Sequence, residues 1–215
     1  MIYREKIFGW LPQVEGASTR IGYIPCTLRS GGTGNFTGAP GQDPDDYTPM
    51  GVSGVTIGVG VDLGQQSVTE LRELALSPSL LDKLEVYVGL TGRAAVIALY
   101  GQPLSITADQ ARALTQAVQN RYLETVVIPW FDRYCGESGA FAALPWQAQT
   151  VVYSLVYQCG PRGALRRGPK TILALSDHDW THAAAYLCDA GGWNGEYLGR
   201  RKKEGQLLRT IGENE

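Results

Sequence analysis

Apolar residues alternate with polar or small residues over positions 55–63, which read VTIGVGVDL. A period of two predicts a β-strand, because successive side chains of a strand point to opposite faces. Further along the chain the apolar spacing becomes helical. Ser67 with Glu70 and Thr107 with Gln110 form capping boxes that mark two helix starts. The pattern therefore predicts a strand followed by a largely helical body.

Turn residues divide the helical body. Pro145 is suited to the first position of a helix through WQAQTVVYSLVYQC, which the Gly-Pro pair at 160–161 ends. Asp177 or Asp179 can cap a helix through DWTHAAAYLC, ended by the Gly pair at 191–192. A final basic helix is expected from about Gly195 to Leu208.

The part of the chain before residue 67 is different. FGWLPQVEG, residues 8–16, has the apolar spacing of a helix, whereas residues 27–54 are rich in Gly, Pro, Asp, Ser and Thr and show no period. We expect a long loop at 27–54, either functional or a flexible insertion. The predicted fold is α+β: a single domain of 215 residues, with an N-terminal helix and small β region in 1–66 and a helical body in 67–215.

Composition narrows the classes of protein. Hydrophobic residues make up 44% and charged residues 19% of the chain, which is typical of a globular protein. A net charge of −2 argues against nucleic-acid binding, and no apolar run approaches the roughly 20 residues of a membrane span. The start, MIYREKIFGW, does not resemble a signal peptide. The chain has four widely spaced cysteines: Cys26, Cys135, Cys159 and Cys188. Their spacing favours buried free thiols, and the alternative is a single disulfide bond formed after export.

The polar face of the predicted strand carries Thr56 and Asp62, with only Gly58 and Gly60 between them. A straight strand would hold the two side chains roughly 20 Å apart, too far to act on one small molecule. A bend at the glycines would place them on neighbouring strands, about 5 Å apart. The alternative is a buried strand with two packing glycines and a solvated aspartate.

Glu15 ends the predicted N-terminal helix. The negative end of the helix dipole, with some burial, favours the protonated carboxyl that a general acid requires. The alternative is an ordinary surface glutamate before a glycine stop.

Together these pieces resemble the phage-type lysozymes, which are peptidoglycan glycosidases of tailed phages. They are more similar to the branch of the bacteriocin pesticin and related toxin domains, in which a Glu, a Thr and an Asp six residues after the Thr form the site. These positions fall on Glu15, Thr56 and Asp62. In the phage enzymes the Asp precedes the Thr by six residues, where this chain has Met50, so the pesticin-like arrangement fits.

Two later segments extend the resemblance. VVYSLVYQCG is similar to a phage-family helix that ends in Phe-Gln-Met-Gly, with Gln158 at the Gln. GGWNGEYLGRRKKEGQLL is similar to Arg-Trp-Tyr-Asn followed by a basic helix, with Trp193, Asn194 and Arg200. The main departure is segment 27–54, which lengthens the chain between the Glu and the Thr.

The resemblance implies a lysozyme-like fold and hydrolysis of the β-1,4 bond between N-acetylmuramic acid and N-acetylglucosamine. Glu15 would protonate the leaving oxygen, and Asp62 would deprotonate a water held by Thr56. The resemblance favours inversion, which needs carboxyl groups about 6.5–9.5 Å apart, whereas about 5 Å would indicate a covalent, retaining route.

The implied partner is bacterial peptidoglycan, with an immunity or inhibitor protein as a further candidate and with no cofactor or metal. The protein would act on the cell wall in the periplasm, either as an endolysin released by a holin or as a toxin or effector domain delivered into a target cell. We expect a monomer. Two rival interpretations are a catalytically silent peptidoglycan-binding domain on the same fold and a glycosidase of chitin.

The candidates for substrate contact are Gln158, Tyr157 and Arg200. Tyr157 lies four residues after Tyr153 on an apolar helix, which favours a core position for both. The basic run at 200–203 is typical of a solvated helix face, and it could also attract an anionic cell wall.

Three further side chains are expected to be structural. His178 and His182 have a spacing that can ligate zinc, but HDWTH is not HExxH and no third ligand is evident. We therefore predict surface or packing histidines. Trp193 could stack on a sugar, but we expect it to anchor the last helix.

Overall fold

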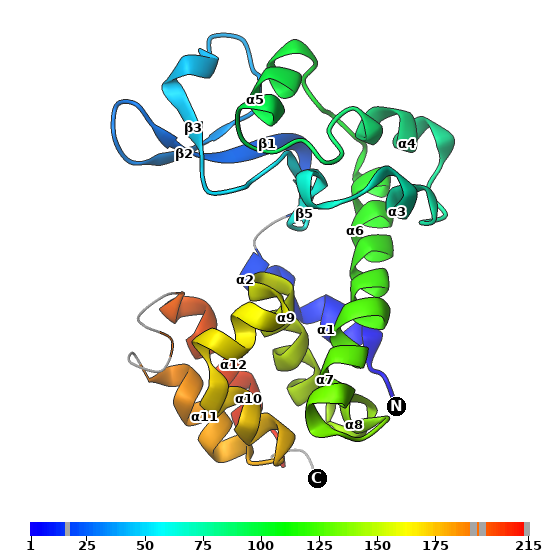
Figure 1. The fold of residues 1–215 in the computed structure, drawn as a ribbon, viewed down its shortest axis with the longest axis vertical. Helices are drawn as coiled ribbons and strands as arrows, with labels where there is room; N and C mark the ends of the chain where they lie inside the picture. The colour runs from blue at the N-terminus through cyan, green and yellow to red at the C-terminus, as the bar shows by residue number, and fades with distance from the viewer. Residues whose placement is uncertain (16–17, 190–192, 194–196, 213–215) are drawn as a thin grey trace. The chain divides into compact units, whose positions relative to one another are not determined.

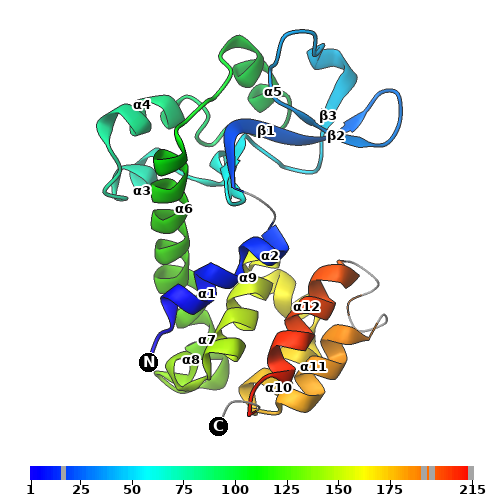
Figure 2. The same ribbon diagram turned by 180° about the vertical axis from the view of Figure 1, so that it is seen from behind.

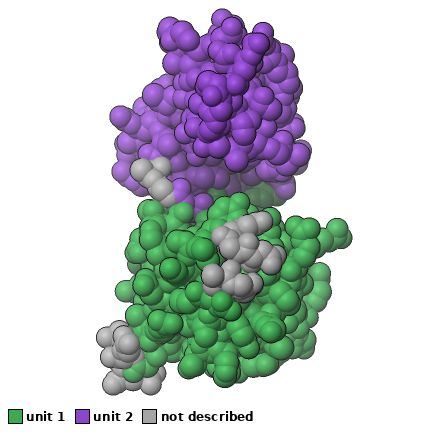
Figure 3. Space-filling view, turned by 90° about the vertical axis from the view of Figure 1, so that its left-hand side faces the viewer, with its two compact units in different colours: residues 1–14, 119–215 green, residues 15–118 purple. Residues whose placement is uncertain are grey.

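A computed structural model describes residues 1–15, 18–189, 193 and 197–212 (Figure 1). The chain forms two compact units, coloured separately in Figure 3: unit 1 contains residues 1–14 and 119–215, and unit 2 contains residues 15–118. All strands of the described residues lie in unit 2, whereas unit 1 is helical there. The α+β class predicted from the sequence is confirmed.

Unit 2 is built on an antiparallel sheet whose strand order is β2-β1-β4-β5, with β3 also paired to β1. The strands are β1 (Thr19–Leu28), β2 (Thr33–Phe36), β3 (Tyr47–Pro49), β4 (Thr56–Gly58) and β5 (Val61–Asp62). One face of the sheet packs on a hydrophobic core that contains Val55, Ile57, Val61 and Leu63. Four of the five alternating apolar residues therefore point to the core, as their period predicts.

Segment 27–54 is not a structureless loop, and the prediction was wrong on this point. It contains β2, β3 and a 3₁₀ turn at Pro44–Asp46. Ile24 of β1 pairs with Phe36, Leu28 pairs with Tyr47, and the two aromatic rings pack with their centroids 5.1 Å apart. Strands of three or four residues are too short to show an alternation among turn residues, so only their pairing with β1 reveals them.

The bend at the glycines is confirmed. β4 and β5 form an antiparallel pair in which Thr56 is the Cα partner of Asp62. Gly58 and Gly60 have φ of 65° and 69°, a left-handed backbone that glycine adopts at little cost. A Cβ at Gly58 would also lie 2.4 Å from Oγ1 of Thr115. Both positions therefore favour glycine for backbone reasons, and Gly58 also for packing.

Helices complete unit 2 beside the sheet (Figure 1). They are α3 (Val68–Arg72), α4 (Pro78–Glu85), α5 (Gly92–Gly101) and the first part of α6 (Ala108–Tyr122). Both predicted capping boxes are confirmed. Ser67 and Glu70 exchange side-chain to backbone hydrogen bonds at the start of α3, and Thr107 and Gln110 do so before α6.

Unit 1 contains most of the remaining helices. The N-terminal ones are α1 (Arg4–Trp10) and α2 (Pro12–Glu15), whose last residue belongs to unit 2. The others are α7 (Ile128–Cys135), α8 (Ala140–Ala143), α9 (Trp146–Arg167), α10 (Pro169–Ser176), α11 (Trp180–Cys188) and α12 (Leu198–Arg209), with a π-helical turn over Leu123–Val127. The last three helices lie side by side in both views (Figures 1 and 2).

Some of the predicted helix boundaries in unit 1 are confirmed and others are shifted. Pro145 is the N-cap of α9 rather than its first helical residue. The backbone breaks at Gly160, with φ 67° and ψ 165°, but a helical segment resumes at once, because proline is suited to a first helical position. Asp179 caps α11 by accepting a hydrogen bond from the His182 amide. The Gly pair at 191–192 and Gly195 lie outside the described residues.

Trp193 anchors the last helix, as predicted. It is 2% exposed within the hydrophobic core of unit 1, and its indole Nε1 donates to Oγ1 of Thr171 at 3.3 Å. The guanidinium of Arg201 on α12 lies over the indole, 4.6 Å from the ring centroid. This cation–π contact fixes α12 to the core.

The four cysteines are free thiols; Cys26 is fully buried, and the other three are half-buried. Among the described helices, none combines the length and the apolar character needed to cross a bilayer.

Candidate active site

A row of three polar side chains crosses the sheet of unit 2. Tyr23 of β1 is the Cα partner of Thr56 on β4, which in turn is the partner of Asp62 on β5. Directly opposed residues of antiparallel strands point to the same face. The adjacent pair Ile57–Val61 faces the core, so the row faces away from it.

Asp62 is held by backbone amides on two sides. Its Oδ1 accepts a hydrogen bond from the Gly64 amide at 2.8 Å, and the Gly54 amide lies 3.2 Å from both carboxylate oxygens. A Cβ at Gly54 would lie 2.7 Å from Oδ1, so this approach requires glycine. The carboxylate is therefore fixed in position beside Thr56, whose residue is only 7% exposed.

The environment of Asp62 favours its protonated form. Burial raises the pKa of this carboxyl, and the hydrogen bonds from the Gly54 and Gly64 amides offset only part of that effect. A carboxylate with a raised pKa is a stronger base than an exposed aspartate.

Glu15 is the last residue of α2, as the sequence predicts, and belongs to unit 2. It is partly exposed, with its Oε1 atom buried. Burial raises the pKa of Tyr23, and the negative charges of Glu15 and Asp62 raise it further. Glu15 and Asp62 thus both act on Tyr23, which is the strand partner of Thr56.

Tyr23 is the site residue that the sequence did not reveal. It is half-buried, and burial raises the pKa of its phenol more than the charges of Glu15 and Asp62 do. The hydroxyl therefore keeps its proton at neutral pH. The local sequence TRIGYIPCTL gives no sign of this, because only the pairing with β4 places Tyr23 beside Thr56.

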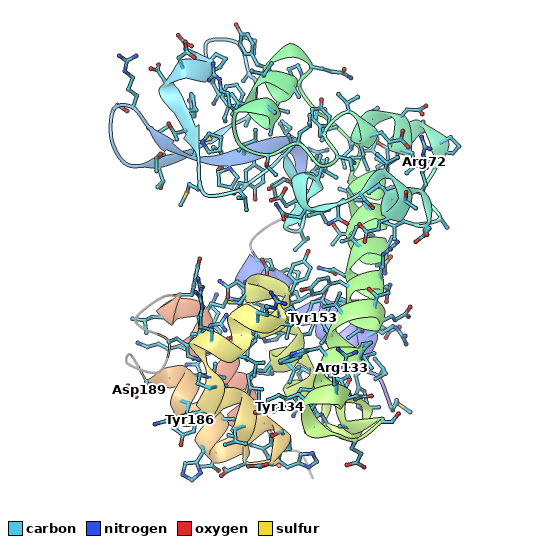
Figure 4. All side chains as sticks on the ribbon, viewed as in Figure 1. Arg72, Arg133, Tyr134, Tyr153, Tyr186 and Asp189 are labelled. Carbon is cyan, nitrogen blue, oxygen red and sulfur yellow. The ribbon has the colours of Figure 1, made fainter. Side chains whose placement is uncertain are left out.

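Gln158, Tyr157 and Arg200 lie in unit 1. Tyr157 packs parallel to Tyr153, labelled on α9 in Figure 4, with ring centroids 5.4 Å apart. Arg200 donates from Nη2 to Oγ of Ser154 at 2.8 Å, and the Oε1 of Gln158 accepts a hydrogen bond from Arg201. Their contact with a substrate stays a prediction.

The basic run at 200–203 is not a solvated face throughout. The side chains of Arg200 and Arg201 are 9% and 0% exposed, and both form ion pairs with the buried Glu204, at 3.2 and 3.0 Å. Burial raises the pKa of Glu204, against the effect of the two arginines. Because Glu204 follows the arginines at helical i+3 and i+4 spacing, its burial draws them inward, so only Lys202 and Lys203 are exposed.

The two histidines have structural contacts. Nδ1 of His182 lies 2.6 Å from Oδ2 of Asp179, and His178 stacks on Trp180 with centroids 5.1 Å apart. In the described part of the chain, no group of three or more His, Cys, Asp or Glu side chains is arranged to hold a metal ion.

The row and Glu15 together provide the groups used in acid–base hydrolysis: two carboxyls, a hydroxyl that can orient water, and a phenol donor. Hydrolysis of a glycosidic bond by two carboxyl groups needs one as acid and the other as base or nucleophile. Asp62, fixed by two amides and with a raised pKa, is suited to the role of base.

One family of known proteins matches this chain. The family model described as pesticin, "Bacterial toxin homologue of phage lysozyme, C-term", matches residues 32–181, which is more than half of the chain. The match includes Thr56 and Asp62, whereas Glu15 precedes it. A search of curated proteins finds no match.

Proposed function

Because this chain belongs to the pesticin family, the bacterial toxin homologues of phage lysozyme, we propose that it hydrolyses bacterial peptidoglycan. The bond cleaved is the β-1,4 bond between N-acetylmuramic acid and N-acetylglucosamine. The observation that carries the proposal is the pairing of Thr56 with Asp62 across the β4–β5 hairpin, beside Tyr23, on which the charges of both Glu15 and Asp62 act.

In the proposed mechanism Glu15 gives its proton to the glycosidic oxygen as the bond to the anomeric carbon breaks. Asp62 removes a proton from the attacking water, which the hydroxyl of Thr56 orients. This division of roles is that of an inverting glycosidase, which leaves room for a water between the carboxyls. The pKa shift of Asp62 supports its role as base, and the family resemblance supports inversion.

The description of the family also indicates how the protein would reach the bacterial cell wall. Its description is that of a bacterial toxin, so we favour a toxin or effector domain over a phage endolysin. The cell wall of a target bacterium would be its site of action, and a producing cell would need an immunity or inhibitor protein.

Muropeptide release tests the proposed function. Purified Gram-negative sacculi are digested with the protein, and the products are labelled at the reducing end and identified by mass spectrometry. Reducing muramic acid on disaccharide muropeptides is the expected result. Binding without release would indicate a silent binding domain, and cleavage of chitin oligomers alone would indicate a different glycosidase.

The raised pKa of Asp62 predicts the acid limb of the activity profile. A base must be deprotonated, so kcat/KM should rise with pH through a value above the ordinary aspartate pKa of about 3.9. Because the folded state holds this proton more tightly than the unfolded chain, protonation of Asp62 at low pH does not destabilise the fold. The profile is measured on soluble fragments, with circular dichroism at each pH. An acid limb at or below the ordinary aspartate value would contradict the prediction.

Tyr23→Phe should lower kcat by less than about tenfold, because it removes one uncharged hydroxyl beside Thr56 and a neutral hydrogen bond contributes about 0.5–1.5 kcal/mol. The acid limb should stay at the parent's pH, because burial and the Gly54 and Gly64 amides set the pKa of Asp62. Tyr100→Phe is the matched control, since Tyr100 is a 55% exposed tyrosine of the same unit. A Tyr23→Phe enzyme with the kcat of the parent would show that the phenol takes no part in the reaction.

A further inference from the structure

A buried hydroxyl of α6 contacts the turn between β4 and β5. Thr115 is 8% exposed, and its Oγ1 accepts a hydrogen bond from the Val59 amide at 3.1 Å. Val59 is the central residue of the turn, with Gly58 before it and Gly60 after it. Thr115 belongs to unit 2, as the turn does. The mechanism proposed above gives this hydroxyl no role.

The turn lies directly against the helix. A Cβ at Gly58 would lie 2.4 Å from Oγ1 of Thr115 and 3.4 Å from the carbonyl oxygen of Ala111, one helical turn earlier. Glycine at position 58 therefore allows an approach that a side chain would prevent. The hydrogen bond from the Val59 amide is buried, and a buried amide without an acceptor is costly. Thr115 thus supplies a partner that this part of the turn needs.

The position of this turn fixes two of the proposed catalytic side chains. Thr56 and Asp62 lie three residues before and three residues after Val59, and they are Cα partners. β5 has only two residues and is an end strand of the sheet, paired among the described strands with β4 alone. So short a strand has few ladder hydrogen bonds, so its place also depends on the turn that leads into it.

Asp62 is consequently held from two directions. The Gly54 and Gly64 amides bind its carboxylate, and Thr115 holds the turn that leads into β5. Catalytic groups must be placed closely, since a displacement of about 1 Å can cost about 100-fold in rate. A contact that fixes the turn therefore bears on the rate although it lies outside the polar row.

We propose that Thr115 is a positioning residue of the glycosidase: its hydroxyl holds the β4–β5 turn so that Thr56 and Asp62 keep the alignment needed to activate water. This role rests on the proposed function and extends it to a residue of α6 that acts through the turn. Because Thr115 would not contact the substrate, its loss should slow the bound complex rather than weaken binding.

Three substitutions of Thr115 test the role of the hydroxyl. Thr115→Val keeps the shape of the side chain but cannot accept from the Val59 amide, and Thr115→Ala removes the hydroxyl without a methyl group in its place. Both should lower kcat about tenfold on soluble peptidoglycan fragments, with KM within about twofold of the parent's value. Thr115→Ser keeps the hydroxyl and should restore most of the rate.

Thr150→Val is the matched control. Thr150 is a fully buried threonine of α9 in unit 1, and its Oγ1 donates to the Trp146 carbonyl of the same helix at 2.8 Å. The substitution removes a buried hydroxyl from a helix, as Thr115→Val does, but leaves the contact with the turn intact. It should keep the kcat of the parent, and thermal melts verify that each variant is folded at the assay temperature.

Hydrogen exchange gives a readout that does not depend on cleavage. Measured by NMR, the Val59 amide should exchange about tenfold faster in Thr115→Val than in the parent, Thr115→Ser and Thr150→Val. Equal exchange in all four proteins would show that the hydroxyl does not hold the turn.

The outcomes separate the two proposals. A parent that releases no muropeptides would overturn the proposed function and the role of Thr115 with it. If the parent cleaves and the folded Thr115→Val and Thr115→Ala variants keep its kcat, the positioning role alone is overturned. A Thr115→Ser variant as slow as Thr115→Val would likewise overturn the assignment to the hydroxyl.

Discussion

Glu15→Gln is expected to abolish peptidoglycan cleavage and to leave the fold intact. Glutamine has the shape of glutamate but no proton to give at neutral pH, so it cannot assist departure of the sugar oxygen. Loss of a general acid typically costs about 100- to 10,000-fold in rate. Because Glu15 is a partly exposed residue at the end of α2, the substitution removes no core packing. The measurement is release of reducing-end-labelled muropeptides by parent and variant.

The matched control is Glu5→Gln, which changes an exposed glutamate one helix earlier in the chain. It should cleave as fast as the parent. If Glu15→Gln were folded and as active as the parent, Glu15 could not be the acid, and the proton would have to come from another group.

Asp62→Asn is expected to have a similar effect on rate for a different reason. The variant cannot take a proton from water, so kcat/KM should fall by about 100- to 10,000-fold and the acid limb of the pH profile should disappear. The structure adds an effect on stability. Burial raises the pKa of Asp62, so at neutral pH its buried charge costs folding free energy, and neutral asparagine removes that cost. The asparagine oxygen can still accept from the Gly64 and Gly54 amides, which both lie within hydrogen-bond distance of Oδ1. The free energy of unfolding at neutral pH, measured by denaturant titration, is therefore expected not to fall.

Two aspartates of segment 27–54 provide the control. Asp45 and Asp46 are exposed residues of the 3₁₀ turn, and Asp45 forms an ion pair with Arg93. Their asparagine variants should retain the parent's activity. If either proved more sensitive than Asp62→Asn, the choice of base would be wrong and the turn would carry the site.

Local sequence predicted much of what bears on the site. The period of two over 55–63 indicated which residues face the core, and the glycines at 58 and 60 indicated a bend. These predictions succeeded because a strand's alternation and a left-handed backbone are properties of a few adjacent residues. Helix caps such as Ser67 and Asp179 were predictable for the same reason.

The site residues Glu15, Thr56 and Asp62 were indicated by residue type and order, and by the family resemblance that their order supports. The family of the chain is confirmed by a match that covers residues 32–181. Their chemical roles stay proposals that the variants above test.

Pairing between distant segments decided the rest. β2 and β3 form because they pair with β1. Tyr23 belongs to the row because it pairs with Thr56. Arg201 is buried because it packs on Trp193 and forms an ion pair with Glu204. None of these facts is encoded in a local period or a turn residue. A short sequence window reports the preference of its own backbone, whereas burial and charge depend on segments that folding brings together from far along the chain. Local sequence therefore determined the bent strand pair at 55–63, the capped helices and the candidate carboxyls, whereas the tertiary structure determined β2, β3 and the environment in which those carboxyls act.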